Sequence, residues 1–257
     1  MSKLLLIVWL QFLKKILGSA SLKMRIKGGP NAGRLWKFGR TTNNEFIIGD
    51  WELPMQKVIS KYLKKGDTVL DLGAHQGFLA MIMCDEVGPD GKVFSFEPLQ
   101  RNFDLLSFHV RVNSISNCVP KFGAVSESSG TVRFTISEAD VSNTYVSTSP
   151  AFSVLVKTAE VPSFSLDDLL KSGEIPCPQF IKVDVEGAEY DVLRGAVNLL
   201  ENCSPIVYLE THDVHNAGVD TQCQGLLDKL GFERLETVAE PGNGFASYVF
   251  RKRLQKL

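Results

Sequence analysis

The sequence predicts an α/β protein built on a doubly wound, mostly parallel β-sheet. From residue 66 onward, short apolar runs rich in β-branched residues alternate with amphipathic segments of helical period. Strands that alternate with helices in this way form right-handed crossovers between parallel strands. The last two strand-like runs, 232–238 and 246–252, are separated only by a short turn, so we expect them to pair as an antiparallel hairpin.

Residues 1–65 precede this predicted core, which occupies residues 66–257. Residues 1–20 contain the apolar run Leu4–Leu13 followed by Lys14 and Lys15, which is shorter than the roughly 20 residues that a bilayer span needs. We expect an amphipathic helix whose apolar face contacts a membrane surface through residues 3–17, or else docks on the domain or on a second subunit. Residues 21–65 predict a hairpin around the turn 28–33 and then a helix.

The core elements follow in alternating order. Strands are expected at 68–73, 92–98, 118–125, 180–187 and 205–211, and helices at 78–88, 102–113, 188–202 and 221–231. Short β patterns at 131–136 and 152–161 flank a Ser/Thr-rich segment, residues 137–153. A loop of this length is often a lid or a binding loop, and Asn143 and Tyr145 would offer hydrogen bonds and stacking to a sugar.

Composition restricts the choice of partners and compartment. The 28 Lys and Arg against 29 Asp and Glu give a formal net charge of −1, so we expect no nucleic acid partner. The five cysteines are scattered and fit neither a disulfide framework nor a zinc site. We therefore expect most of them, and Cys84 and Cys203 most clearly, to be ordinary core residues in a reducing cytoplasm.

The segment "DLGAHQG", Asp71–Gly77, indicates a nucleoside site, because ligands of such sheets bind at the carboxyl ends of the strands. Gly73 and Gly77 allow a tight turn and a close approach to a ligand. The loop has His75 in place of the middle glycine that a dinucleotide's pyrophosphate requires, which argues against NAD and FAD. Asp71 favours a cationic ligand, and Glu97 at the end of the next strand can accept both ribose hydroxyls. S-adenosylmethionine fits this description.

These residues, together with "FIKVDVEGAEYDVLRGA" at 180–196, resemble the FkbM-type family of S-adenosylmethionine-dependent methyltransferases. The likeness runs from about Gly49 to Thr211 and includes "GDWE", "FSFEPLQRNFDLL" and "PIVYLE". It implies the class I methyltransferase Rossmann-like fold of seven strands. The implied activity is methyl transfer to a hydroxyl oxygen of a carbohydrate, a glycolipid precursor or a secondary metabolite.

The resemblance also implies roles for individual residues. Those of the cofactor site are Glu52, which would close over the cofactor, Glu97 on the ribose, and Asp71, Gly73, Ala74, His75 and Gly77 in the loop. The family usually has Asn where this sequence has His75, a change that would alter the polarity of the pocket around the methionine part of the cofactor.

Acidic side chains follow two strands that should be neighbours in the sheet. Asp184 and Glu186 follow one strand, and Glu210 and His212 end the next. We predict Asp184 as the base or as the carboxylate that orients the substrate, with Glu210 or His212 second. The same cluster could instead hold Mg²⁺, but with no third firmly placed carboxylate we predict transfer without a metal. Lys182 is predicted to tether a neighbouring carboxylate.

Two other classes of function stay open at this level. One is a nicotinamide-dependent oxidoreductase on a similar sheet, and the other is a non-catalytic interaction module that keeps the methyltransferase fold. We expect a cytoplasmic enzyme, peripheral to the inner membrane face if the first helix binds lipid. The sequence leaves open the hydroxyl acceptor and whether the chain forms a homo-oligomer.

Overall fold

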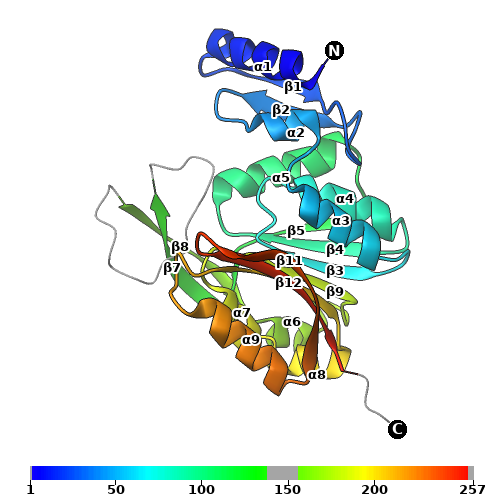
Figure 1. Cartoon of the computed structure of the whole chain (residues 1–257), viewed down its shortest axis with the longest axis vertical. Helices are drawn as coiled ribbons and strands as arrows, with labels where there is room; N and C mark the ends of the chain where they lie inside the picture. Colours follow the sequence, from blue (N-terminus) through cyan, green and yellow to red (C-terminus); the bar gives the residue numbers. More distant parts are fainter. Residues whose placement is uncertain (1, 138–155, 254–257) are drawn as a thin grey trace.

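The computed structural model describes residues 2–137 and 156–253, and its centre is a seven-stranded sheet in the order β11-β12-β10-β9-β3-β4-β5 (Figure 1). Five of the strands are parallel: β3 (Thr68–Leu72), β4 (Lys92–Glu97), β5 (Cys118–Phe122), β9 (Phe180–Val183) and β10 (Ile206–His212). The remaining pair, β11 (Phe232–Gly242) and β12 (Phe245–Lys252), forms an antiparallel hairpin whose β12 also runs antiparallel to β10. The predicted doubly wound sheet with its C-terminal hairpin is confirmed.

Helices cover both faces of this sheet (Figure 1). One face carries α3 (Leu53–Tyr62), α4 (Phe78–Val87) and α5 (Gln100–Val112), and the other carries α6 (Leu166–Ser172), α7 (Glu189–Arg194), α8 (Val197–Cys203) and α9 (Val219–Lys229). Successive strand residues alternate between the two layers, with Val69 and Phe180 in one core cluster and Leu70 and Ile181 in the other. Burial on both faces explains why these strands read as continuous apolar runs.

Two predicted elements are divided in the structure. The expected helix at 188–202 is broken into α7 and α8 at Gly195, where a Cβ atom would lie 2.2 Å from the Ser126 carbonyl oxygen. The Asp167 carboxylate accepts hydrogen bonds from the backbone N–H groups of Asn198 and Leu199 and so caps the start of α8. Similarly, the run 118–125 separates at Gly123 into β5 and β6 (Ala124–Val125). These breaks depend on distant backbone contacts.

A second, three-stranded sheet has the order β6-β8-β7. It consists of β6, β7 (Gly130–Ser137) and β8 (Val156–Phe164), which confirms the two short β patterns. The proposed lid residues Asn143 and Tyr145 fall outside the described residues. The short helix α2 (Asn44–Ile48) and helix α6 were not predicted from the sequence.

The prediction for Cys203 was wrong. Cys203, at the end of α8, forms a disulfide with Cys177, which precedes β9, across a Cα–Cα distance of 5.3 Å. The two residues are 26 positions apart, so only the packing of α8 beside the entry to β9 brings them together. Cys84, Cys118 and Cys223 are buried free thiols, as expected.

The predicted N-terminal hairpin is present as β1 (Ser21–Arg25) and β2 (Leu35–Gly39), and α1 (Lys3–Leu17) precedes it. His109 of α5 ties the hairpin to the Asp71–Gly77 loop, because its Nε2 accepts a hydrogen bond from the Lys37 N–H at 3.0 Å and its Nδ1 lies 2.9 Å from the Gln76 carbonyl oxygen. An Nε2 that accepts requires an Nδ1 that donates, so the ring is neutral. Burial lowers the pKa of His109 to about 4, which agrees with that state.

Candidate active site

A cavity of about 550 Å³ opens at the carboxyl ends of β3, β4, β9 and β10. Its wall contains nine of the ten residues predicted from the sequence, namely Glu52, Asp71, Gly73, Ala74, His75, Glu97, Asp184, Glu210 and His212. Gly77 is the exception and does not line the cavity. The cofactor loop and the far-strand acids therefore meet around one space, as the parallel strand order requires.

The two loop glycines form the tight turn that the sequence predicts, and both also pack closely against other parts of the protein. Gly73 has φ 79°, and a Cβ atom there would lie 1.8 Å from the carbonyl oxygen of Asp184. Gly77 has φ 86°, and its Cβ would lie 2.5 Å from Cδ1 of Leu106. Both residues let the loop pack closely against protein, Gly73 against the end of β9 and Gly77 against α5.

Glu97 is buried and joins two loops at the end of β4. One carboxylate oxygen accepts the backbone N–H of His75 at 2.8 Å, and the other accepts that of Leu99 at 2.9 Å. Burial raises the pKa of Glu97 to about 8, even though these hydrogen bonds favour the ionised form. The Asn102 side chain also hydrogen-bonds to Glu97, and a carboxylate has about four acceptor positions, so Glu97 can still receive a hydroxyl group from a ligand in the cavity.

His75 and Glu52 both have left-handed backbones, with φ 50° at each, and both line the cavity. The His75 ring lies parallel to the Trp51 indole, with ring centroids 6.3 Å apart, and 6.0 Å from the ring of Phe46. Histidine at this position thus extends an aromatic cluster at the cavity wall. Burial and the nearby charge of Asp184 raise the pKa of Glu52 to about 8.

A buried lysine supports the base of the site. The Nζ of Lys182 lies 2.9 Å from Asp184 Oδ2 and 3.7 Å from Asp71 Oδ1, and it donates to the Gly73 carbonyl at 3.1 Å. The prediction that Lys182 tethers a neighbouring carboxylate is confirmed. Burial disfavours the charged lysine, but the charges of Asp184 and Asp71 outweigh it, so the pKa of Lys182 lies above its usual value.

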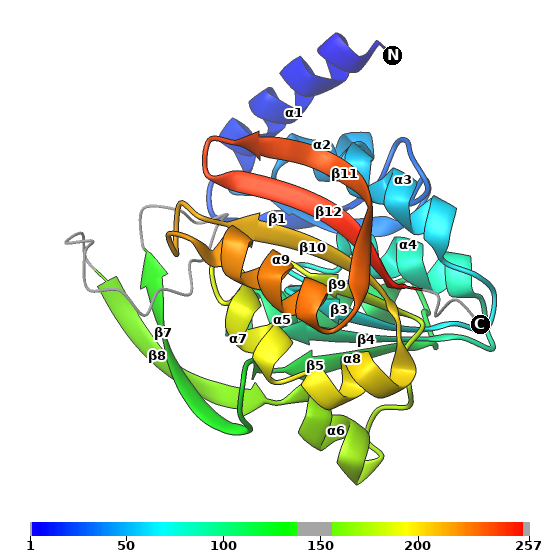
Figure 2. The same ribbon diagram turned by 60° about the horizontal axis from the view of Figure 1, so that its bottom comes forward.

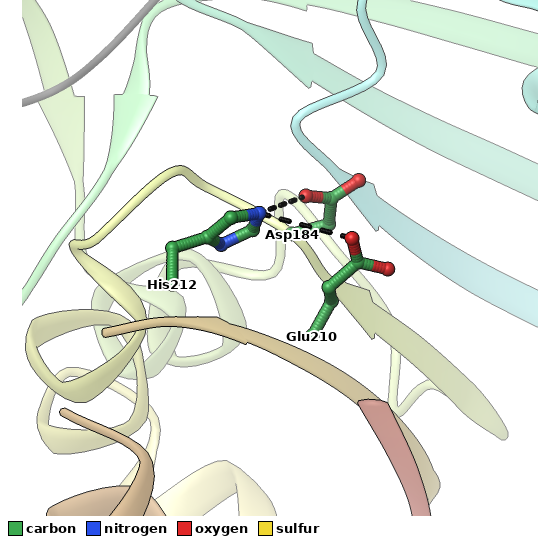
Figure 3. Close-up of side chains that lie close together, drawn as sticks. All are labelled: Asp184, Glu210 and His212. Carbon is green, nitrogen blue, oxygen red and sulfur yellow. Dashed lines mark ion pairs between the residues drawn. The ribbon is translucent and has the colours of Figure 1, made fainter. Parts of the chain in front are cut away.

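The far-strand residues converge on the imidazole of His212 (Figure 3). Its Nε2 lies 3.7 Å from Asp184 Oδ1, 3.7 Å from Glu210 Oε1 and 3.5 Å from Glu186 Oε2. Its Nδ1 lies 2.7 Å from Oε1 of Glu189, a fully buried carboxylate. Glu189 is the first residue of α7, where a carboxylate is favourable for the helix dipole. Its contact with His212 gives it a more specific role, because it fixes the orientation of that ring.

The pKa values separate the roles of these groups. Burial opposes the charge on His212, but the hydrogen bond to Glu189 and the charge of Asp184 raise the pKa of this imidazole to about 9. Burial likewise opposes ionisation of Asp184, yet the charges of Lys182 and His212 hold the pKa of that carboxyl below its usual value. Burial and the charge of Asp184 raise the pKa of Glu210. Of the two carboxyl groups, Glu210 has the raised pKa and is therefore the stronger base when it is ionised.

The same three side chains could hold a divalent cation. Asp184, Glu210 and His212 each offer one ligand atom, and these atoms lie within 4.8 Å of one another. A carboxylate on the far nitrogen of a histidine is common at metal sites. Two positive charges oppose a metal ion here, the Lys182 ammonium at 2.9 Å from Asp184 and the proton that a pKa of about 9 leaves on His212.

Sequence reasoning did not single out the rest of the cavity wall. The additional residues include the apolar Trp51, Phe78, Phe96, Val132 and Phe245, and the polar Asn102, Ser126, Arg133 and Asn216. Trp51 and Phe96 are next to predicted residues in the chain, so their position could have been inferred. Phe245 is different, because only the return of the C-terminal hairpin brings its ring to 5.4 Å from that of His212, edge to face.

The sheet order, the acid-bearing loops and the shared cavity at the strand ends are those of the class I methyltransferase fold, and comparison with known proteins agrees. The model of the methyltransferase FkbM domain matches residues 71–237. The chain belongs to the FkbM methyltransferase family. The oxidoreductase and interaction-module alternatives are not favoured by these findings.

Among curated proteins, the hexuronic acid methyltransferase AglP of Haloferax volcanii is 32% identical over 164 residues, which span 64% of this chain and 62% of that protein. Among solved structures, an FkbM methyltransferase from Methylobacillus flagellatus aligns with a TM-score of 0.52 and 16% identity, over 72% of this chain and 43% of that one. TYW2 of M. jannaschii, crystallised with AdoMet, aligns with a TM-score of 0.51 and 10% identity, over 91% and 85% of the two chains. These two structures support the fold.

Proposed function

We propose that the protein transfers a methyl group from S-adenosylmethionine to a hydroxyl oxygen of a carbohydrate. The observation that carries this proposal is a single cavity whose wall contains Glu97, which contacts the loop after β3, together with the Asp184–Glu210–His212 cluster. Acids outnumber bases in the cavity wall, and such a surface suits a cationic ligand. A nucleoside sulfonium meets both requirements, with its ribose on Glu97 and its charged end toward the acids.

The residues of the cavity would divide the work of the transfer. S-adenosylmethionine, when bound, supplies an electrophilic methyl group as a sulfonium. Asp184, kept ionised by Lys182, accepts a hydrogen bond from the acceptor hydroxyl and holds that oxygen in line with the methyl carbon. Glu210, with its raised pKa, would accept the proton that the acceptor hydroxyl loses. His212, held by Glu189, keeps the two carboxylates together.

For the acceptor we propose a sugar acid. The curated relative is described as a hexuronic acid methyltransferase, and the cavity offers one place for an anionic group. Arg133 of β7 lines the wall with a side chain that is 70% exposed, and Glu160 is its neighbour at 3.1 Å. Because the base of the cavity is acidic, a uronic acid carboxylate would be repelled there and would instead face Arg133.

Calorimetric titration with S-adenosylhomocysteine tests the cofactor. We expect the wild type to bind and Glu97→Ala to bind about tenfold more weakly, because a hydrogen bond to a ribose hydroxyl contributes about 0.5–1.5 kcal/mol and Glu97 also holds the backbone N–H groups of His75 and Leu99. Glu201→Ala, at an exposed position on α8, is the matched control and should bind as the wild type does. No binding by the folded wild type, or binding of NAD instead, would refute the proposal.

Methyl transfer to a uronic acid glycoside and to the matching neutral glycoside tests the acceptor. Arg133→Gln should raise KM for the uronic acid about tenfold and leave KM for the neutral sugar unchanged, because the lost interaction is with the carboxylate. Equal turnover of both glycosides by the wild type would show that the carboxylate is not recognised, although methyl transfer itself would stand.

A further inference from the structure

The first helix has two apolar sides, and the domain covers only one of them. Leu6 and Leu10 are buried in the core cluster, and Leu13 and Leu17 pack against it. The other side carries six large apolar residues that are between 44% and 71% exposed: Leu4, Leu5, Val8, Trp9, Phe12 and Ile16. Their spacing places them along one side of the helix, which we call the free face of α1. Docking on the domain and binding elsewhere, which seemed alternatives from the sequence, are thus both available to α1.

The free face belongs to the most basic part of the chain. Residues 1–50 contain nine of the 28 Lys and Arg but only two of the 29 Asp and Glu, a net charge of +7 in a chain whose total is −1. Within this segment the basic side chains exposed to solvent are Lys3, Lys15, Lys23, Arg25, Lys27, Lys37 and Arg40. Lys3 pairs with Asp50, one of the two acids. The exposed apolar helix therefore belongs to a segment with a large excess of positive charge.

From these two observations we propose that the free face of α1 binds the surface of a bilayer that contains anionic lipids. Helices that lie in the membrane interface combine an apolar face with basic residues that meet lipid phosphates. Trp9 and Phe12 are aromatic residues of the kind that such interfaces accommodate. Among the described residues no helix is long and apolar enough to cross a membrane, and α1 with its 15 residues would lie along the surface.

The positive charge of residues 1–50 favours a membrane over a second copy of this chain as the partner of the free face. A symmetric dimer through the free face would bring two segments of net charge +7 against each other. An anionic lipid surface instead attracts this segment while the apolar side chains enter the boundary between headgroups and acyl chains. In Figure 1 α1 lies at the end of the molecule opposite α8, with β1, β2 and α2 beneath it, so a flat surface can reach it. Figure 2 shows the same helix extending along the outside of the domain.

Co-sedimentation of the full chain with vesicles tests the proposal. The probes are vesicles of phosphatidylcholine alone and of phosphatidylcholine with phosphatidylglycerol. We expect binding to the mixed vesicles, weakening with salt, and a blue shift of tryptophan fluorescence as Trp9 enters the interface. Phe12→Ser with Ile16→Ser should lower vesicle affinity at least about tenfold, because each loses the burial of a large apolar side chain.

Two controls separate this loss from a folding defect. Gln11→Ser changes an exposed polar residue of the same helix and should bind as the wild type does. The melting temperature of the Phe12→Ser/Ile16→Ser variant should match that of the wild type, because both side chains are exposed, Phe12 at 61% and Ile16 at 64%. The proposal would be overturned if folded wild type stays in solution with the mixed vesicles. It would also be overturned if light scattering finds a dimer that the double variant abolishes, since the free face would then join two copies.

Discussion

Replacing Lys182 by methionine should remove the ammonium group that lies closest to the buried carboxylates Asp71 and Asp184 at the base of the site. Its side chain is 2% exposed, and its ammonium lies 2.9 Å from Asp184 and 3.7 Å from Asp71. Methionine has similar length and fits the same space, so packing changes little. Breaking a buried ion pair from one side costs about 3–5 kcal/mol, because a charge is left without a partner. For a chain of this size that corresponds to a fall in melting temperature of roughly 6–20 °C.

Urea denaturation and thermal melts would measure this loss, with Lys121→Met as the matched control. Lys121 pairs with Glu174 at 3.0 Å near the surface, where the glutamate side chain is 52% exposed, and such pairs contribute about 0–1 kcal/mol. Adding Asp184→Asn to Lys182→Met should restore part of the stability, because one uncompensated charge disappears. If Lys182→Met lost no more stability than Lys121→Met, the buried charges would not be compensated in the way that the structure indicates.

Three further predictions concern protonation and metals. His109 has a pKa of about 4 when folded against 6.5 as its ordinary value, so its neutral form stabilises the fold fully above pH 6.5 and that contribution is lost as pH falls toward 4. Between pH 6.5 and pH 4 the free energy of unfolding of the wild type should fall by roughly 3 kcal/mol more than that of His109→Gln, as measured by denaturation at each pH. Parallel plots of unfolding free energy against pH for the two proteins would contradict this. Glu210→Gln should lower kcat about 10²- to 10⁴-fold and remove the rise in rate with pH that ionisation of Glu210 produces. Binding of S-adenosylhomocysteine should be retained. A fall in kcat of less than tenfold would point to Glu186 as the base. Methyl transfer should persist after dialysis against EDTA, because Lys182 and protonated His212 already supply positive charge at the cluster; activity that is lost and then restored by Mn²⁺ would assign a metal to Asp184, Glu210 and His212.

Local pattern was sufficient for much of the fold. The strand that contains Asp71, the helix from Phe78 and the hairpin at the C-terminal end each follow from period and turn residues within about 15 positions. The break at Gly195 does not, because it reflects the approach of the Ser126 carbonyl from 69 positions earlier in the chain. The pairing of Cys203 with Cys177 was missed for the same reason.

The site shows the same division. The residue types and their places at the strand ends indicated that Glu97, Asp184 and Glu210 would face one cavity, since parallel strands end at a common edge. Pattern could not show that the Glu189 carboxylate contacts the His212 imidazole, nor that the Lys182 ammonium lies 2.9 Å from Asp184 and lowers the pKa of that carboxyl. Those contacts depend on burial and on distances of a few ångströms.

By itself, then, the sequence determined the doubly wound sheet, the strand ends that carry the acids and the kind of cofactor they suit, because these follow from periodicity and from residue chemistry within each element. The tertiary structure alone decided the protonation of His212, the packing roles of Gly73 and Gly77 and the half-covered state of α1. Each of these is set by which distant side chains and backbone groups come within contact, and electrostatic and steric energies at such distances change sharply over an ångström.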